Sequence, residues 1–334
     1  MTPDFTFRDG ERVIRFGRGV VAEAAGLIEA QGLGGYALLS TERAMSRAPA
    51  SLTAGAATVL HVPAGPVPEI AAAVRDEVHG RPLVAFGGGR VVDAAKAIAA
   101  ADGLCVAAIP TTLAGSSYTP FHRMPAGVEG YGSTRPVLAV CDADLMASAP
   151  MPGLAATAMN ALAHAVEALY APGANPVSES AALRAAVLIA SGLKDPEPVR
   201  SELAEAAVLA GYAVGVAGLC VHHAVCQTIV RVAETPHAAT NAVMLPHTVA
   251  FMAGRAPREI EALAEALGSS GRDGVADTVA RLSAKTMVTS LGQLGFEPAR
   301  AGEVASTALH HPGVALTPGD VTLDDLRSLV GSAL

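Results

Sequence analysis

The pattern of apolar positions changes character near the middle of the chain. Up to about residue 147, short apolar runs alternate with stretches whose apolar residues recur at helical spacing, which predicts strands separated by helices. The predicted strands are residues 36–40, 57–62, 83–86, 105–109 and 137–141, with an edge strand at 13–16, and the predicted helices are 19–31, 68–77 and 91–100. Because strands joined by helices pair in parallel, we expect a mainly parallel sheet covered on both faces.

Pro150 and Pro152 interrupt this pattern, since proline continues neither a helix nor a central strand. Beyond them the strand signal fades and helical spacing dominates. The predicted helices, with some breaks inside them, are residues 154–170, 176–192, 202–232, 239–252, 257–267, 273–294 and 323–333. The sequence therefore predicts a Rossmann-like α/β domain over residues 1–150, followed by an all-helical domain over residues 151–334.

Composition narrows the class of protein further. The 334 residues are 51% hydrophobic and 16% charged, which excludes a disordered chain. A formal net charge of −8 argues against nucleic acid as a partner. The N-terminus lacks the apolar core of a signal peptide, and the longest uncharged run, residues 206–221, is short for a membrane span. Four cysteines without a CxxC pair predict reduced, buried thiols in a cytoplasmic protein with no membrane partner.

A glycine triplet follows the predicted strand 83–86 and opens the next helix. Without side chains, Gly87, Gly88 and Gly89 allow a backbone to approach a pyrophosphate, whose negative charge the helix N-terminus favours. Arg90 could add positive charge, and Asp93 with Lys96 lies in fixed register along the helix. We interpret the segment as a dinucleotide-binding turn. An ordinary strand-to-helix turn is the alternative.

Hydroxyl side chains cluster in the loop after the next predicted strand. Thr111, Thr112, Ser116 and Thr119 would lie at the carboxyl end of a strand, where open α/β sheets place their ligands. These hydroxyls could bond a ribose, a phosphate or a substrate. They could equally satisfy the backbone of a capped turn.

The helical part carries four side chains in a frame suited to a divalent metal. Asn160 and His164 lie four residues apart, with Glu167 one turn further on, and His223 and His237 follow in a second helical stretch. Three imidazoles could hold Zn²⁺ or Fe²⁺, but the amide of Asn160 gives no charge compensation. Metal binding is therefore possible without being implied. Glu167 could orient His164, although we expect it to belong to a structural network.

These segments together resemble the iron-containing alcohol dehydrogenase superfamily. The resemblance rests on 87–89 with Asp93 and Lys96, on 110–120, on 160–170, and on 235–237 with 245–247. Residues 5–8, 13 and 16–17, and Asn160 where metal-dependent relatives have aspartate, are most similar to the maleylacetate reductase branch. The resemblance spans nearly the whole chain. It implies the dehydroquinate synthase-like fold, with a dinucleotide-binding domain followed by a helical domain.

Several positions depart from the family pattern, and most lie near the expected site. Arg90 replaces the usual serine after the glycines, and Gln227 replaces a histidine placed beside the nicotinamide and the substrate. Arg231 and Val232 stand where a small, glycine-rich turn is usual, and residues 310–313 replace an Asn-Pro-Arg type segment. Since an imidazole can donate a proton near neutral pH and an amide cannot, the change at Gln227 bears on the substrate.

The resemblance implies an NADH- or NADPH-dependent cytoplasmic reductase that converts maleylacetate, or an analogue, to 3-oxoadipate. We expect a homodimer in aromatic compound metabolism, acting on a small anionic substrate. Without a metal, protonated or hydrogen-bonding His164, His223 and His237 would stabilise the charge that develops on the substrate carbonyl, and the Asn160 amide would orient an imidazole or a substrate oxygen. Arg90, Arg135 or Arg231 could hold a carboxylate.

Two other functions remain open at this stage. A metal-dependent alcohol dehydrogenase would use the same three histidines, with water or substrate completing the coordination shell. A catalytically retired relative would bind a nucleotide without turnover, which the changes at Arg90 and Gln227 could mark. Cofactor titration with a substrate panel separates these readings.

Overall fold

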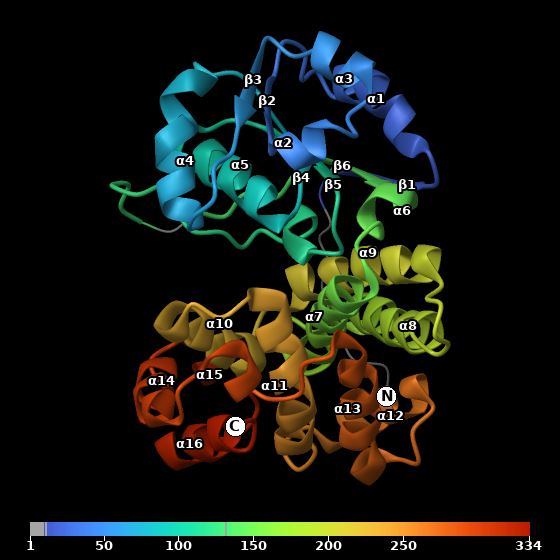
Figure 1. Cartoon of the computed structure of the whole chain (residues 1–334), viewed down its shortest axis with the longest axis vertical. Coiled ribbons are helices and arrows are strands. Elements are labelled where there is room, and N and C mark those ends of the chain that lie inside the picture. Colours follow the sequence, from blue (N-terminus) through green and yellow to red (C-terminus); the bar gives the residue numbers. More distant parts are fainter. Residues whose placement is uncertain (1–9, 11, 131) are drawn as a thin grey trace. The chain divides into compact units, whose positions relative to one another are not determined.

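The chain forms two compact units, and the computed structural model describes residues 10, 12–130 and 132–334. The first unit is Met1–Ser148 and the second is Ala149–Leu334. The boundary lies within two residues of the position at which the two prolines interrupt the sequence pattern. Figure 1 labels the helices and strands of both units.

A six-stranded parallel sheet forms the centre of the first unit (Figure 1). Its strands are β1 (Val13–Gly17), β2 (Ala37–Ser40), β3 (Thr58–His61), β4 (Leu83–Gly87), β5 (Val106–Pro110) and β6 (Leu138–Asp142). The strand order is β1-β6-β5-β4-β2-β3. The expected parallel sheet is confirmed, and residues 13–16 form an edge strand as predicted.

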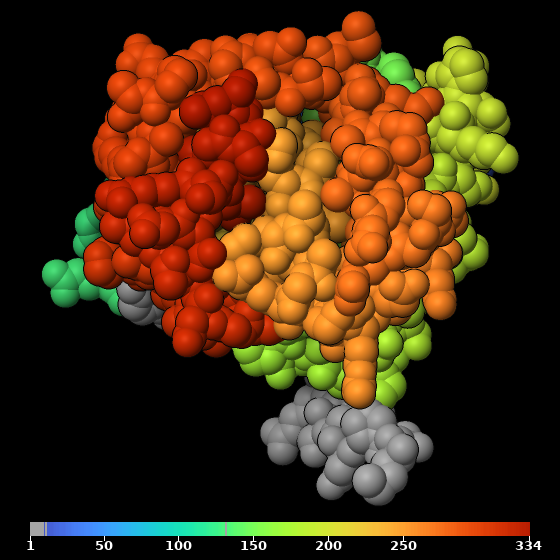
Figure 2. Space-filling view, turned by 90° about the horizontal axis from the view of Figure 1, so that it is seen from below, coloured from blue at the N-terminus to red at the C-terminus, as the bar shows by residue number. Residues whose placement is uncertain are grey.

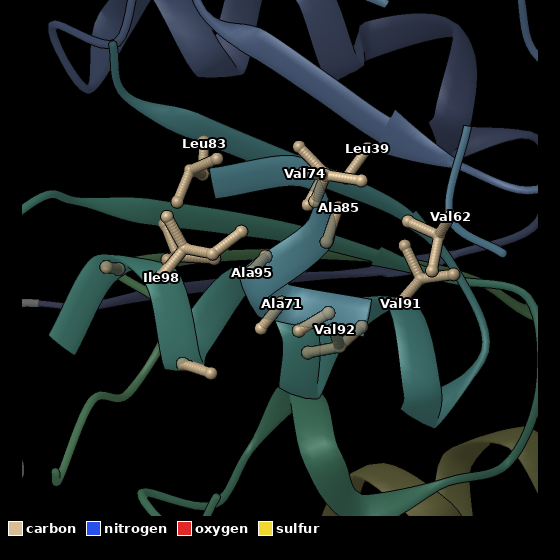
Figure 3. Packing of buried hydrophobic residues seen from close by; sticks show 14 of the residues in the cluster. Leu39, Val62, Ala71, Val74, Leu83, Ala85, Val91, Val92, Ala95 and Ile98 are labelled. Atoms are coloured by element: carbon tan, nitrogen blue, oxygen red, sulfur yellow. The ribbon is translucent and has the colours of Figure 1, made fainter. Parts of the chain in front are cut away.

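Both faces of this sheet are buried. Successive side chains of a strand point to opposite faces, and every residue of β4 is buried. Leu83 and Ala85 belong to one apolar cluster, which helices α4 (Val67–Arg75) and α5 (Gly89–Asp102) cover (Figure 3). Val84 and Phe86 belong to a second cluster, which α1 (Ala24–Ala30) and α3 (Ala50–Ala54) cover. Two short helices, α2 (Glu42–Met45) and α6 (Ala143–Met146), follow β2 and β6.

The order of the strands reverses between β2 and β4. The chain passes from β2 outward to β3, then crosses back to place β4 on the other side of β2. Open α/β sheets bind ligands at the carboxyl ends of the strands at such a reversal. The glycine triplet stands at the end of β4, and the hydroxyl-rich loop follows the adjacent β5. The fold therefore brings both predicted cofactor segments to one edge of the sheet.

The second unit is helical in all its regular elements within the described residues. Its helices are α7 (Met151–Tyr170), α8 (Pro176–Gly192), α9 (Arg200–Ala217), α10 (Val221–Ala233), α11 (His237–Met252), α12 (Pro257–Leu267), α13 (Val275–Ser283), α14 (Ala301–Ala308), α15 (Pro312–Ala315) and α16 (Leu323–Gly331). Helix α7 is buried over nearly its whole length and contacts α8, α9 and α11. In Figure 2, α11 is seen between the C-terminal helices and the segment of α12 and α13.

The helix boundaries differ from the sequence expectations in three places. The predicted helix 202–232 is two helices that bend by 102° around Gly218, whose φ of 107° lies in the glycine-favoured region. The predicted helix 273–294 ends at Ser283, beyond which only short 3-10 turns occur up to Leu294. Among the short helices, α2, α3, α6, α14 and α15 were not predicted. Their short lengths give too few turns for a helical period to be recognised.

Among the described residues, no single helix is long and apolar enough to cross a membrane, and α9 and α10 meet that test only as a bent pair. The four cysteines are free, as predicted. The expectation that all of them are buried is wrong for Cys105, which is exposed because it lies just before β5 begins.

Candidate functional site

The glycine triplet packs against the hydroxyl-rich loop. A Cβ added at Gly88 would lie 3.2 Å from Thr112 Cγ2, and one at Gly89 would lie 3.1 Å from both Ala114 Cβ and Ser116 Oγ. Gly88 has φ −78° and ψ −177°, a backbone conformation open to any residue. At Gly88 and Gly89 the close approach of the loop, rather than a special backbone conformation, therefore favours glycine.

No side chain caps the N-terminus of α5, whose N-cap residue is Gly88. The first N–H groups of a helix have no partner within it, and they bind anions with help from the helix dipole. Ser40, at the end of β2, is fully buried and donates to the carbonyl of Phe86 at 2.6 Å. This bond joins the two strands that flank the reversal point. The turn is thus held on a rigid frame, and phosphate binding there stays a prediction.

A buried lysine fixes the loop beside this turn. Lys96 is fully buried, and its ammonium donates to Asp93 Oδ1 at 2.9 Å and to the carbonyls of Ser116 and Phe121 at 3.1 and 2.6 Å. Burial lowers the pKa of Lys96, while the Asp93 carboxylate opposes that shift. The Ser116 hydroxyl donates to Asp93 Oδ2 at 3.0 Å. Asp93 and Ser116 therefore brace the loop within the protein, and direct contact with a cofactor stays a prediction for both.

The other predicted cofactor residues are placed around the same edge. Arg90 is exposed on the first turn of α5. Thr111 donates its backbone N–H to the carbonyl of Gly87 at 3.0 Å, and Thr119 is buried. The structure brings the glycine triplet and the hydroxyl loop together, and it holds Arg90 where its side chain is free to reach a ligand.

In the helical unit, a histidine pair is buried between α7 and α10. His164 and His223 are 8% and 2% exposed, and their rings stack with centroids 4.7 Å apart and an interplanar angle of 5°. Burial, reinforced by His223, His237 and His222, lowers the pKa of His164 well below its usual range. Burial also lowers the pKa of His223 to about 3. Both rings are therefore neutral near pH 7.

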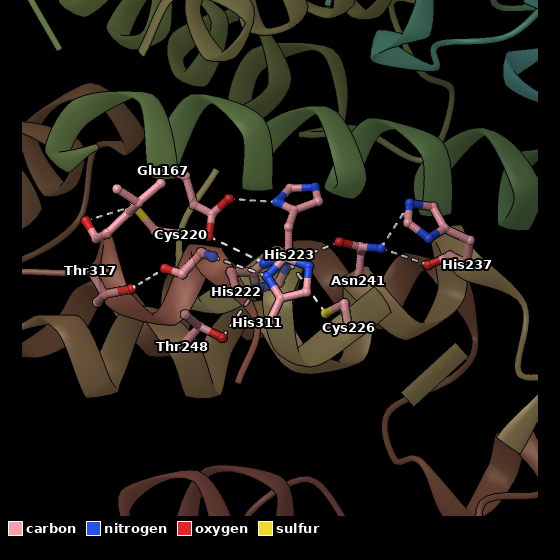
Figure 4. Close-up of polar contacts among 12 residues, drawn as sticks. Glu167, Cys220, His222, His223, Cys226, His237, Asn241, Thr248, His311 and Thr317 are labelled. Atoms are coloured by element: carbon pink, nitrogen blue, oxygen red, sulfur yellow. Dashed lines mark hydrogen bonds and ion pairs between the residues drawn. The ribbon is translucent and has the colours of Figure 1, made fainter. Parts of the chain in front are cut away.

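Glu167 contacts the second of these histidines, not His164 as one sequence interpretation suggested (Figure 4). Its Oε2 lies 2.6 Å from His223 Nδ1, and its Oε1 accepts the backbone N–H of His223 at 3.2 Å. Burial raises the pKa of Glu167, whereas His222 and backbone N–H groups at the start of α10 oppose the rise.

A second polar chain connects α10 with α11 (Figure 4). His222 is fully buried, with Nδ1 3.1 Å from Thr248 Oγ1 and Nε2 3.0 Å from Asn241 Oδ1. The Asn241 amide donates to the carbonyl of His237 at 2.8 Å and lies 3.3 Å from its Nε2. His237 thus joins the cluster through Asn241 and His222. It is exposed and begins α11, so the expectation that His223 and His237 share one helical stretch is wrong.

Three buried polar atoms of this cluster lack a partner within the described structure: Asn160 Oδ1, His164 Nδ1 and His223 Nε2. Leaving such atoms unpaired costs free energy, which a bound ligand or water would recover. A metal ion suits the set poorly. The lone pairs of parallel, stacked rings cannot point at one ion, and no three His, Cys, Asp or Glu side chains of the described residues form a group able to hold a metal. The cluster fits a hydrogen-bonding ligand better.

Sequence reasoning did not identify several members of this network. Asn241 and Thr248 carried no recognisable spacing, and His222 could not be distinguished from an ordinary core histidine. Gln227 is half-buried on α10 and Arg231 is exposed near its end. Two histidines in succession at the start of a helix were the one available signal, because adjacent positions point to different faces and so to different partners.

Comparison with known proteins places this arrangement in a family context. Residues 154–334 match the C-terminal model of the Fe-containing alcohol dehydrogenase family. Maleylacetate reductase 1 of Rhodococcus opacus is 39% identical over 264 residues, which cover 75% of this chain and 72% of that protein.

Solved structures extend the likeness over the whole fold. The crystal structure of maleylacetate reductase from Agrobacterium tumefaciens aligns with a TM-score of 0.87 at 28% identity, covering 100% of this chain and 99% of that one. Sulfoacetaldehyde reductase from Bifidobacterium kashiwanohense, solved in complex with NAD+, shares the fold with a TM-score of 0.86 at 22% identity, covering 99% of each chain.

Proposed function

The chain belongs to the Fe-containing alcohol dehydrogenase family, and we propose that it is an NAD(P)H-dependent reductase of maleylacetate or a closely similar oxo acid. Family membership confirms the resemblance seen in the sequence and makes the protein an oxidoreductase. The named substrate comes from its relatives, which include the maleylacetate reductases of Rhodococcus opacus and Agrobacterium tumefaciens.

Reduction of maleylacetate saturates its conjugated C=C bond. A bound reduced nicotinamide would supply the hydride, and addition of one proton would complete the conversion to 3-oxoadipate. In the first unit, the glycine turn and the uncapped start of α5 would hold the pyrophosphate. Thr112, which lies against Gly88, would bond a phosphate or ribose oxygen. Whether the cofactor is NADH or NADPH is left to measurement.

The buried, unpartnered atoms of the histidine cluster carry the proposal for the substrate. His164 Nδ1, His223 Nε2 and Asn160 Oδ1 are buried atoms left for a ligand to pair with. Asn160 Oδ1 can only accept, so the donor to the charge that develops on the substrate carbonyl would be the N–H of His164. A donor in a buried site stabilises developing charge more than one in water, so it can favour the transition state over the ground state. The low pKa of each ring favours neutral, hydrogen-bonding imidazoles over the protonated ones considered from sequence.

The test is a substrate panel read by loss of nicotinamide absorbance. Maleylacetate, fumarate, which lacks the oxo group, and a simple aldehyde are each offered with NADH and with NADPH. We expect turnover with maleylacetate and little with the other two. Activity confined to the aldehyde would favour a general alcohol dehydrogenase, and tight nucleotide binding without any turnover would favour a retired binding protein.

Alanine substitutions test the assignment of the residues. His164→Ala removes the proposed donor to the developing charge, and His223→Ala removes the ring stacked on it, so both are expected to lower kcat roughly 10- to 1000-fold while changing cofactor affinity little. His310→Ala, which removes an exposed histidine of the same unit, is the matched control. Wild-type kcat in both cluster variants would contradict the assignment.

We further propose a cytoplasmic homodimer that acts in aromatic compound metabolism on a small anionic substrate. Free cysteines and a net charge of −8 support the compartment and the absence of nucleic acid. Sedimentation of the purified protein tests the dimer. A monomer at micromolar concentration would contradict it.

A further inference from the structure

Glu167 lies in the buried C-terminal half of α7 and meets the first turn of α10. The residue is fully buried, and the N-cap of α10, Cys220, gives that helix no side-chain cap. The Glu167 carboxylate accepts the backbone N–H of His223, and its second oxygen faces the ring of the same residue. One carboxylate thus serves the helix terminus and the histidine at once. An anion at a helix N-terminus is stabilised by the helix dipole.

We propose that Glu167 is a positioning residue that fixes His223 with its proton on Nδ1, so that Nε2 is presented to the ligand as a hydrogen-bond acceptor. The backbone N–H groups at the start of α10 favour the ionised form of Glu167 against the effect of burial, and an ionised carboxylate can only accept, so Nδ1 donates across the 2.6 Å contact. Since the ring is neutral, its other nitrogen carries a lone pair. That nitrogen, His223 Nε2, is the buried atom without a partner in the described structure.

Because His223 Nε2 would accept a hydrogen bond, the ligand must offer a donor at this position. A lone pair on Nε2 pairs with a group that donates, such as an enol hydroxyl or a bound water, and does not pair with a bare carbonyl oxygen. The stacked ring of His164 restrains the His223 ring from rotating, so the direction of the lone pair is fixed as well as its identity. The effect on turnover rests on the proposed function, whereas the state of the ring does not.

Glu167→Gln separates positioning from simple capping. The backbone N–H of His223 can only donate, so it would hold the amide oxygen in place of Oε1 and turn the amide nitrogen toward Nδ1. An amide nitrogen donates, which would force Nδ1 to accept and move the proton to Nε2. The substitution therefore keeps the volume and the cap while reversing the polarity of the nitrogen that faces the ligand.

Nitrogen NMR of ¹⁵N-histidine-labelled protein reads the ring directly, with His223 assigned by its loss in His223→Ala. We expect protonated Nδ1 in the wild type and protonated Nε2 in Glu167→Gln. Tyr170→Phe, one turn further along α7, removes a buried hydroxyl and leaves the carboxylate, so it should keep the wild-type ring state. A wild-type ring state in Glu167→Gln, or protonated Nε2 in the wild type, would overturn the proposal.

Kinetics provide the second readout. Glu167→Gln should lower kcat roughly 10- to 100-fold, as substitutions of residues that orient a site residue commonly do, with cofactor affinity unchanged. If Glu167 acts through His223, adding Glu167→Gln to His223→Ala should lower kcat no further. Full additivity in that double variant would show a role unconnected with His223. Inactivity of the wild type toward maleylacetate would instead refute the proposed function, because the NMR result needs no substrate.

Discussion

The histidine cluster should make the stability of this protein fall on mild acidification. His222 and His223 are 0% and 2% exposed. Burial, then the neighbouring His223, lowers the pKa of His222 to about 3. Burial, then His237 and His311, lowers the pKa of His223 to about 3. Both rings therefore stay neutral in the folded protein at pH values where the same histidines of an unfolded chain are protonated.

The sign follows from counting protons in the two states. A histidine in an unfolded chain titrates near about pH 6.5. Between that pH and the folded value of about 3, the unfolded chain binds more protons than the native protein. The free energy of unfolding therefore falls as pH falls through this window, and it is fully retained above about pH 6.5.

The magnitude is large enough to measure. For one histidine with these two pKa values, a change from about pH 7.5 to about pH 5 removes roughly 2 kcal/mol of stability. Two independent histidines would lose roughly 4 kcal/mol, a large part of the usual 5–15 kcal/mol total. The rings of His222 and His223 lie 5.1 Å apart, so their protonation is coupled and single variants give the cleaner test.

Urea unfolding at the two pH values, followed by circular dichroism because the chain has no tryptophan, provides the assay. In His222→Asn the amide can keep the bond to Thr248 while the titrating group is removed. This variant should be less stable than wild type at about pH 7.5, by roughly 1–3 kcal/mol for the lost bond to Asn241. Its further loss on acidification should be smaller than the wild-type loss by roughly 2 kcal/mol.

His310→Asn is the control for this comparison, because it removes an exposed imidazole outside the cluster. It should preserve the pH dependence of the wild type. If His222→Asn loses as much stability on acidification as the wild type does, the buried ring does not carry the effect, and the reasoning from burial fails.

Three further outcomes are expected. Gly88→Val should weaken NAD(P)H binding in a fluorescence titration, because its Cβ would meet Thr112 at 3.2 Å and crowd the phosphate turn. Gly26→Ala is the control, since an added Cβ there meets nothing within 4 Å, and it should leave NAD(P)H binding unchanged. Gln227→His should raise turnover of maleylacetate if the missing imidazole limits activity, and no gain would indicate a pocket rebuilt for another compound. Purified protein should contain far less than one equivalent of Zn or Fe, and EDTA should not lower turnover. Stoichiometric metal whose removal abolishes activity would refute the metal-independent role assigned to Asn160.

Local sequence signals predicted much of the fold because the determining interactions are short in range. The predicted strands at residues 36–40 and 83–86 appear as β2 and β4, and the glycine triplet starts α5 where expected. Apolar runs between turn residues are sufficient to identify buried parallel strands. The bend at Gly218 was missed because an apolar helix can continue through glycine at modest cost, and only tertiary packing selects the bend.

The polar partners inside the helical unit could not be predicted in this way. Helical spacing placed His164 and Glu167 near one another, but the contact of Glu167 with His223 depends on how α7 packs against α10. The bond from His222 to Asn241 likewise depends on the packing of α10 against α11. Spacing describes one helix surface, whereas these hydrogen bonds join two.

The neutral amide of Asn160 is electrostatically compatible with the stacked rings of His164 and His223. Two protonated imidazoles with centroids 4.7 Å apart would repel by roughly 3–4 kcal/mol at an effective dielectric of about 20, so the stack disfavours protonation of both rings at once. A carboxylate at position 160 would favour protonation of His164 one turn away and thereby oppose the stack. The amide adds no charge, so nothing at position 160 draws a proton onto His164. The same substitution that removes an anionic metal ligand therefore also permits the ring arrangement in which His223 offers its lone pair to a ligand.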